Sequence, residues 1–288
     1  MRGWRALGAV AVAGLVAVAG GLIGGACGET SSDDALTPEA RAGRALDAGD
    51  PLRAVDILRD ATEPRLVALR GRAQVARHRW SDAEQELTAL GADPAAASLR
   101  CDLAVARRDV ASERLCKAAI AADPADLRAK LDLARALDDL GRPAEGEKLL
   151  RDLLVDQGDD DRVWAALVDH YEHFGWIREA VDTLATWRMR RPFTAKVGER
   201  LAAALRRKVR GDLLEKRWLE ASVAARWLLA EVPSEAVTRF YLADALDGLG
   251  KKAEAEAERK AAEAAGAKKP PPVNAPRELS GPPDGHEH

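Results

Sequence analysis

The sequence predicts an all-α fold built from a row of helix hairpins, and three observations carry this prediction. Ala and Leu supply most of the apolar content, while the 288 residues include only three Phe and two Tyr. Charged residues make up 32% of the chain and are mixed in sign, so that strong helix formers dominate. Apolar residues also recur at spacings of three and four within units of 34 residues, which is typical of stacked hairpins.

The clearest unit spans residues 161–194. Each half places its large residues on one helical face, and Gly175 between them suits a turn. The residues on the two faces are Trp164, Leu167 and Tyr171, then Ala180, Leu184 and Trp187, and Pro192 ends the unit. This pattern resembles the tetratricopeptide repeat, in which a small residue lets two helices approach and large residues fill the gaps between hairpins.

The pattern recurs in phase over residues 35–266, which predicts seven antiparallel hairpins. Two positions depart from it, because Gly146 replaces the small Ala and Gly158 replaces the terminal Pro. Extra residues after Thr194 predict one first helix that is about two turns longer than the others. The resemblance implies a right-handed superhelical solenoid whose first helices line a concave groove.

Residues 1–26 have the composition of a signal peptide or membrane anchor. Arg2 and Arg5 precede the uncharged stretch 6–23, and small residues lead into Cys27. This junction resembles the lipobox of bacterial lipoproteins, in which the cysteine is lipidated, although Gly24 stands where Leu is usual. The polar residues 27–34 are expected to be a tether.

An uncleaved anchor, an ordinary cleaved signal and a cytoplasmic chain stay open as alternatives, because the apolar stretch is just long enough to span a bilayer. Lipidation at Cys27 would hold the repeat domain outside the cytoplasm in the bacterial cell envelope, at the inner or the outer membrane. Residues 267–288 are rich in proline and are expected to be disordered.

The chain carries no phosphate-binding glycine loop, nucleophile elbow or zinc-spaced Cys/His set, so no enzymatic activity, cofactor or small-molecule substrate is expected. Its 44 basic and 47 acidic residues give no overall attraction to nucleic acid. The resemblance instead implies a scaffold or assembly factor that binds a protein or peptide in the groove. The groove-facing candidates by repeat position are Arg128, Leu131, Arg135, Asp138, Arg162, Asp169, Glu172 and His173.

The family's Asn- and Lys-based grip on C-terminal carboxylates is absent, because the sole Asn is Asn274 in the tail. His170 and His173 have a spacing that metal sites use, but their register places only His173 toward the groove. A polar groove lining is therefore favoured over a metal site.

Cys101 and Cys116 fall in one hairpin, where an oxidising envelope would permit a disulfide. Cys101 occupies a groove-facing repeat position and Cys116 a buried one, so their register disfavours the bond without excluding it.

Charge is segregated along the chain. Residues 188–217 hold eleven basic and three acidic residues, while residues 123–182 hold sixteen acidic and eight basic ones. Solvated helix faces explain this, and the alternative is a signal-anchored protein whose basic patch binds anionic lipid or an acidic partner. The patch residues are Arg188, Arg190, Arg191, Arg206, Arg207, Lys208 and Arg210.

Overall fold

The computed structural model describes residues 36–192, 194–271 and 273, and within them the chain forms fourteen α-helices and no strand. The predicted signal peptide or anchor, Cys27, the predicted tether and the residues beyond Val273 lie outside the described residues. The helices are α1 (Pro38–Asp47), α2 (Pro51–Ile57), α3 (Pro64–Ala76), α4 (Trp80–Leu90), α5 (Ala95–Ala106), α6 (Ser112–Ala122), α7 (Leu127–Asp139), α8 (Pro143–Asp156), α9 (Asp161–His173), α10 (Ile177–Arg190), α11 (Ala195–Leu214), α12 (Trp218–Glu231), α13 (Val237–Gly248) and α14 (Lys252–Ala264).

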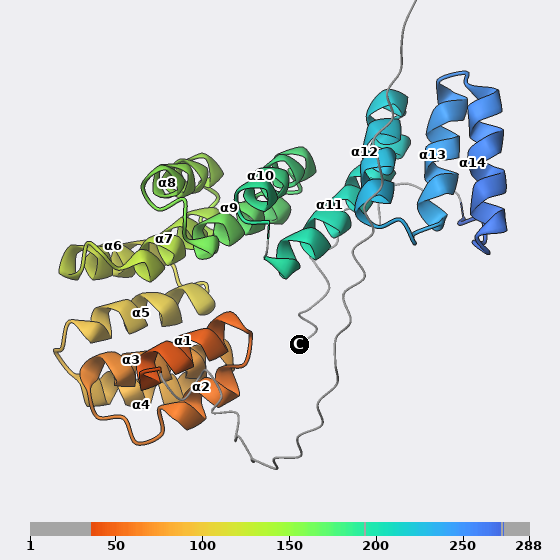
Figure 1. Ribbon diagram of the computed structural model, residues 1–288. Coiled ribbons are helices and arrows are strands. Elements are labelled where there is room, and N and C mark those ends of the chain that lie inside the picture. Colours follow the sequence, from red (N-terminus) through yellow and green to blue (C-terminus); the bar gives the residue numbers. More distant parts are fainter. Residues whose placement is uncertain (1–35, 193, 272, 274–288) are drawn as a thin grey trace, which may run out of the picture.

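Consecutive helices pair into hairpins that stack as a curved solenoid (Figure 1). The first helices α7, α9, α11 and α13 lie on the inner side of the curve, while α8, α10 and α14 lie on the outer side. The predicted all-α hairpin solenoid is confirmed. The predicted long helix is also present, since α11 has 20 residues against 13 in α9.

The core of each hairpin is built from the residues that define the repeat. Tyr171 and Trp164 are each only 2% exposed, and Ala180 is completely buried where α10 meets α9. Both tryptophans of this hairpin satisfy their ring N–H groups, because Trp164 donates to the Gly158 carbonyl at 2.8 Å and Trp187 to Asp161 at 3.0 Å. The repeat signature therefore marks packing positions.

Every hairpin turn contains one residue in the left-handed backbone region, at the same place in each hairpin. Four turns use glycine there, but three use residues with a Cβ, which raises the energy of this conformation by about 1–2 kcal/mol. The glycines are Gly49, Gly141, Gly175 and Gly250, and the other three residues are His78, Arg108 and Lys216, with φ of 57°, 54° and 58°.

Lys216→Gly is expected to raise the free energy of unfolding by about 1 kcal/mol, because it removes the strained Cβ from an exposed turn. Gly175→Ala should lower it by about the same amount, since a Cβ there meets no atom within 4 Å and only the backbone is affected. Urea denaturation measures both. Shifts of the same sign in the two variants would contradict this account of the turns.

A disulfide joins Cys101 on α5 to Cys116 on α6, with sulfur atoms 2.02 Å apart and Cα atoms 4.6 Å apart. The expectation that Cys101 faces the groove is wrong. Helix α5 packs against α3, α6 and α7, so residues 101–105 are all buried and the usual groove position on this helix is covered. Cys101 therefore meets Cys116 inside the hairpin.

Among the described residues, no helix combines the length and the apolar character needed to cross a bilayer. After α14 the chain turns at Gly266, and Val273 is half-buried against the apolar cluster formed by α9 to α14.

Candidate functional site

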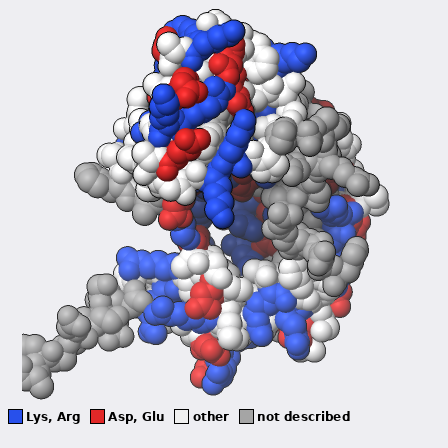
Figure 2. Space-filling model, turned by 90° about the vertical axis from the view of Figure 1, so that its right-hand side faces the viewer, with Lys and Arg blue, Asp and Glu red and all other residues white. Residues whose placement is uncertain are grey.

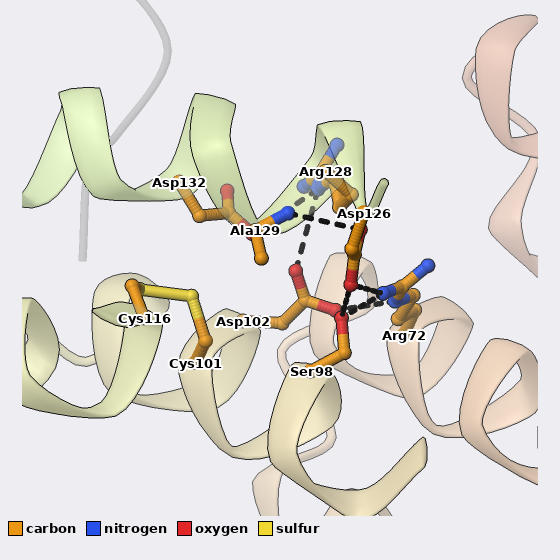
Figure 3. The surroundings of a disulfide bond; sticks show 9 residues. All are labelled: Arg72, Ser98, Cys101, Asp102, Cys116, Asp126, Arg128, Ala129 and Asp132. Carbon is orange, nitrogen blue, oxygen red and sulfur yellow. Dashed lines mark hydrogen bonds and ion pairs between the residues drawn. A yellow bond between two sulfur atoms is a disulfide. The ribbon is translucent and has the colours of Figure 1, made fainter. Parts of the chain in front are cut away.

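A network of charged side chains with buried carboxyl groups at its centre connects three successive first helices, α3, α5 and α7 (Figure 3). Asp102 on α5 lies at its centre. Arg72 donates through Nε to Asp102 Oδ2 at 2.6 Å, and Arg128 donates through Nε to Asp102 Oδ1 at 3.3 Å and to Asp132 at 3.2 Å. Ser98 donates its hydroxyl to Asp126 and accepts a hydrogen bond from Arg72. The network fixes the spacing of three repeats.

The pKa values of the two central carboxyl groups of this network are shifted in opposite directions. Burial alone would raise the pKa of Asp102, but the charges of Arg72 and Arg128 and a hydrogen bond from Asp132 outweigh it and hold that pKa below its usual range. Burial raises the pKa of Asp132 well above its usual range, and the negative charge of Asp102 raises it further. The neutral form, which can donate a hydrogen bond to Asp102, is therefore favoured more at Asp132 than at Asp102.

A second buried pair connects α7 to α9. His170 is 2% exposed, and its Nδ1 lies 2.9 Å from both carboxylate oxygens of Asp138. The rings of Tyr171, Phe174 and Trp176 surround the imidazole edge-on. The prediction that Asp138 faces the groove is wrong, because its side chain is 10% exposed and is engaged with His170.

The pairing explains why Gly146 departs from the repeat pattern. A Cβ at this position would lie 2.5 Å from Asp138 Oδ1 and 3.1 Å from the Ala134 carbonyl oxygen. Gly146 therefore provides the space in which the Asp138 carboxylate sits.

Gly146→Ala is expected to destabilise the protein by about 2 kcal/mol, although alanine is the usual residue of the repeat and the better helix former. The added methyl group would displace Asp138 and leave the buried His170 without its partner. Thermal unfolding measures the effect. Ala134→Gly leaves the Asp138–His170 pair in place and serves as a control, and a Gly146→Ala protein more stable than wild type would contradict this account.

Ion pairs connect helix α9 to helix α11. Arg200 on the long helix α11 pairs with Asp169 at 2.7 Å and with Glu172 at 2.8 Å. These two acidic groove candidates therefore bind a residue of the chain itself, and the single charge of Arg200 offsets part of their negative charge where α9 faces α11.

The basic stretch 188–217 does not form a free cationic surface, because most of its charges are paired within the fold. Lys208 and Arg217 both pair with the buried Asp212, at 2.8 and 2.6 Å. The remaining patch contacts are Arg188 with Glu231, Arg191 with Asp161 at 3.5 Å, Arg206 with Glu235 at 2.6 Å, and Arg190 with the Trp164 ring at 5.5 Å. Arg207 and Arg210 are half-buried. The stretch connects α10, α11 and α12 to their neighbours.

Most of the other groove candidates lie at the surface. Leu131 and Glu172 are half-buried. Arg162 pairs with Asp160 at 2.6 Å, in the loop just before α9. The exposed candidates are Arg128, Arg135, Arg162, Asp169 and His173.

Sequence reasoning missed Arg72, Ser98, Asp102 and Asp132. The only available signal was the presence of opposite charges at neighbouring positions of successive first helices. Spacing within one repeat does not report the contacts of Asp102 with Arg72 and with Arg128, because each of them joins two repeats.

The turns, the buried repeat residues and the stacked hairpins agree with a comparison of sequences, in which residues 110–169 match the family model of the tetratricopeptide repeat. Residues 110–169 of this chain are therefore tetratricopeptide repeats. No curated protein sequence matches it.

Similarity to solved structures is in keeping with the tetratricopeptide fold. A thermophilic tetratricopeptide-repeat protein of Thermus thermophilus superimposes with a TM-score of 0.50 at 17% identity, over 58% of this chain and 97% of that one. MamA superimposes with a TM-score of 0.38 at 18% identity, over 57% of this chain and 87% of the MamA chain. A human IFIT1 dimer with PPP-AAAA superimposes with a TM-score of 0.41 at 17% identity, over 78% of this chain and 59% of the IFIT1 chain. At 17% identity, the match to the Thermus thermophilus protein shows the fold alone.

Proposed function

We propose that this tetratricopeptide-repeat protein is a non-enzymatic scaffold or assembly factor of the bacterial cell envelope, which binds a peptide or helix of another protein in its concave groove. One observation carries the proposal. The inner helices present exposed polar side chains at groove positions, including Arg135 on α7 and His173 on α9. Stacked first helices form extended concave surfaces of this kind in repeat proteins.

The envelope location is supported by the cysteines. The buried Cys101–Cys116 disulfide fits an oxidising compartment, since such bonds persist outside the cytoplasm. Cys27 follows small residues at the end of an apolar segment and is the proposed lipidation site. The alternative, a signal-anchored protein whose basic patch binds anionic lipid, is less well supported because that patch is largely paired internally.

The binding half of the proposal is tested by filling the groove. His173→Trp places a bulky side chain at an exposed groove position on α9, and Met189→Trp does the same on the outer helix α10, where Met189 is 77% exposed. Crosslinking and pull-down from membranes should recover partner protein with wild type and Met189→Trp but much less with His173→Trp. Equal recovery by both variants would reject groove binding.

The tether is tested separately by Cys27→Ala. We expect this variant either to leave the membrane fraction or to accumulate with its signal segment uncleaved. Normal processing with full membrane retention would reject lipidation at Cys27.

A further inference from the structure

Between α3 and α7 the acidic and basic side chains differ in depth. The carboxylates of Asp102, Asp132 and Asp126 are 3%, 7% and 14% exposed, whereas the side chains of Arg72 and Arg128 are 25% and 51% exposed. The surface of this part of the groove is therefore cationic, although the total charge of these arginines and aspartates is close to zero. Figure 2 shows a hollow in one face of the molecule with basic side chains inside it.

The two guanidinium groups are anchored in a way that leaves donors available. Arg128 contacts both carboxylates through Nε alone, and no contact of its terminal nitrogens with the described residues is found. Arg72 uses Nε and Nη2. Figure 3 shows a terminal nitrogen of each group directed away from Asp102. Such anchored guanidinium groups lose little freedom on binding, and they match carboxylate oxygens in geometry.

Two more arginines extend this surface. Arg135 lies seven residues after Arg128, which is two turns along the same face of α7, and it is exposed and forms no ion pair within the described part of the chain. Arg162 on α9 is 53% exposed and is oriented by Asp160. Beyond these arginines the groove is no longer cationic, because Arg200 is paired with the carboxylates of Asp169 and Glu172.

We propose that the groove segment lined by Arg72, Arg128, Arg135 and Arg162 binds an acidic stretch of the partner protein, whose Asp or Glu carboxylates contact these guanidinium groups. This inference rests on the proposed function and specifies the partner's chemistry. Three of these arginines lie on α7 and α9, on the inner side of the curve, which favours a protein segment over a membrane surface because a flat layer of lipid headgroups does not enter a concave groove.

The test uses the full-length protein in detergent and a labelled 20-residue peptide of Glu and Ala, with its Gln and Ala counterpart, measured by fluorescence anisotropy. The Glu peptide should bind at least ten-fold more tightly than the Gln peptide and should weaken as salt is raised. Arg135→Glu should weaken binding of the Glu peptide at least ten-fold. Arg178→Glu, a matched charge reversal on the outer helix α10, should alter it less than two-fold.

Arg135 is chosen because it supports no buried carboxylate, so its loss leaves the network intact. Equal binding of both peptides, or unchanged binding by Arg135→Glu, would overturn the acidic-partner proposal. Arg135-dependent binding to phosphatidylglycerol vesicles without binding to the Glu peptide would also overturn it, in favour of lipid. A different result would reject the proposed function itself: unchanged capture of the partner protein by the His173→Trp variant.

Discussion

Replacing both Cys101 and Cys116 with alanine is expected to lower the free energy of unfolding by about 3 kcal/mol, the effect of opening a covalent loop of this length. The bond spans 15 positions of sequence and joins the two helices of one hairpin, so it restricts the unfolded chain. The Cys101 side chain is completely buried, and its replacement also loosens the packing between α5 and α7.

Urea denaturation with and without reductant measures the contribution of the disulfide. Reductant should destabilise wild type but leave the double alanine variant unchanged. Wild type that resists urea equally well in both conditions, while thiol titration confirms reduction, would contradict a stabilising role for the bond.

Asp102→Asn is expected to destabilise the protein by about 3 kcal/mol at neutral pH, because it removes the buried charge that pairs with Arg72 and Arg128. Asp132→Asn should cost much less. The pKa of Asp132 is raised by burial and by the charge of Asp102, so this carboxyl group acts as a hydrogen-bond donor, which an amide can replace.

The two carboxyl groups also predict opposite dependences on pH. The pKa of Asp102 is lowered in the folded state, so its contribution is present above the usual carboxyl range and is lost as pH falls through the lowered value. The pKa of Asp132 is raised, so its contribution is complete below the usual range and is lost as pH rises through the raised value.

Unfolding measured from pH 5 to pH 9 separates these contributions. Relative to wild type, Asp132→Asn should gain stability as pH rises, whereas Asp102→Asn should be less stable throughout this range. An Asp132→Asn protein that loses more stability than Asp102→Asn at neutral pH would show that the assigned protonation is reversed.

The hairpins were predictable from sequence because the residues that define the repeat are also its packing residues. Trp164, Leu167, Tyr171 and Ala180 are buried as their spacing requires. The length of α11 was equally readable, since the extra residues keep the helical period. Local periodicity therefore determines the element boundaries.

Contacts between repeats were not predictable in the same way. Asp138 has the sequence position of a groove residue, but its direction is decided by His170 on the next first helix and by the missing side chain of Gly146. The prediction that Cys101 faces the groove was wrong for a similar reason. The helices packed around α5 bury the Cys101 side chain completely. Each contact depends on a partner about 30 residues away or on the adjacent helix, which a repeat pattern does not specify.

The central claim, that the concave groove is the binding surface of a scaffold, is tested most directly by site-specific photocrosslinking in the living cell. A photoreactive residue at His173 on the inner helix α9 is compared with one at Met189 on the outer helix α10, both of which are exposed. We expect a discrete partner adduct from position 173 and none from position 189. An adduct from position 189 alone, or none from either position, would contradict it.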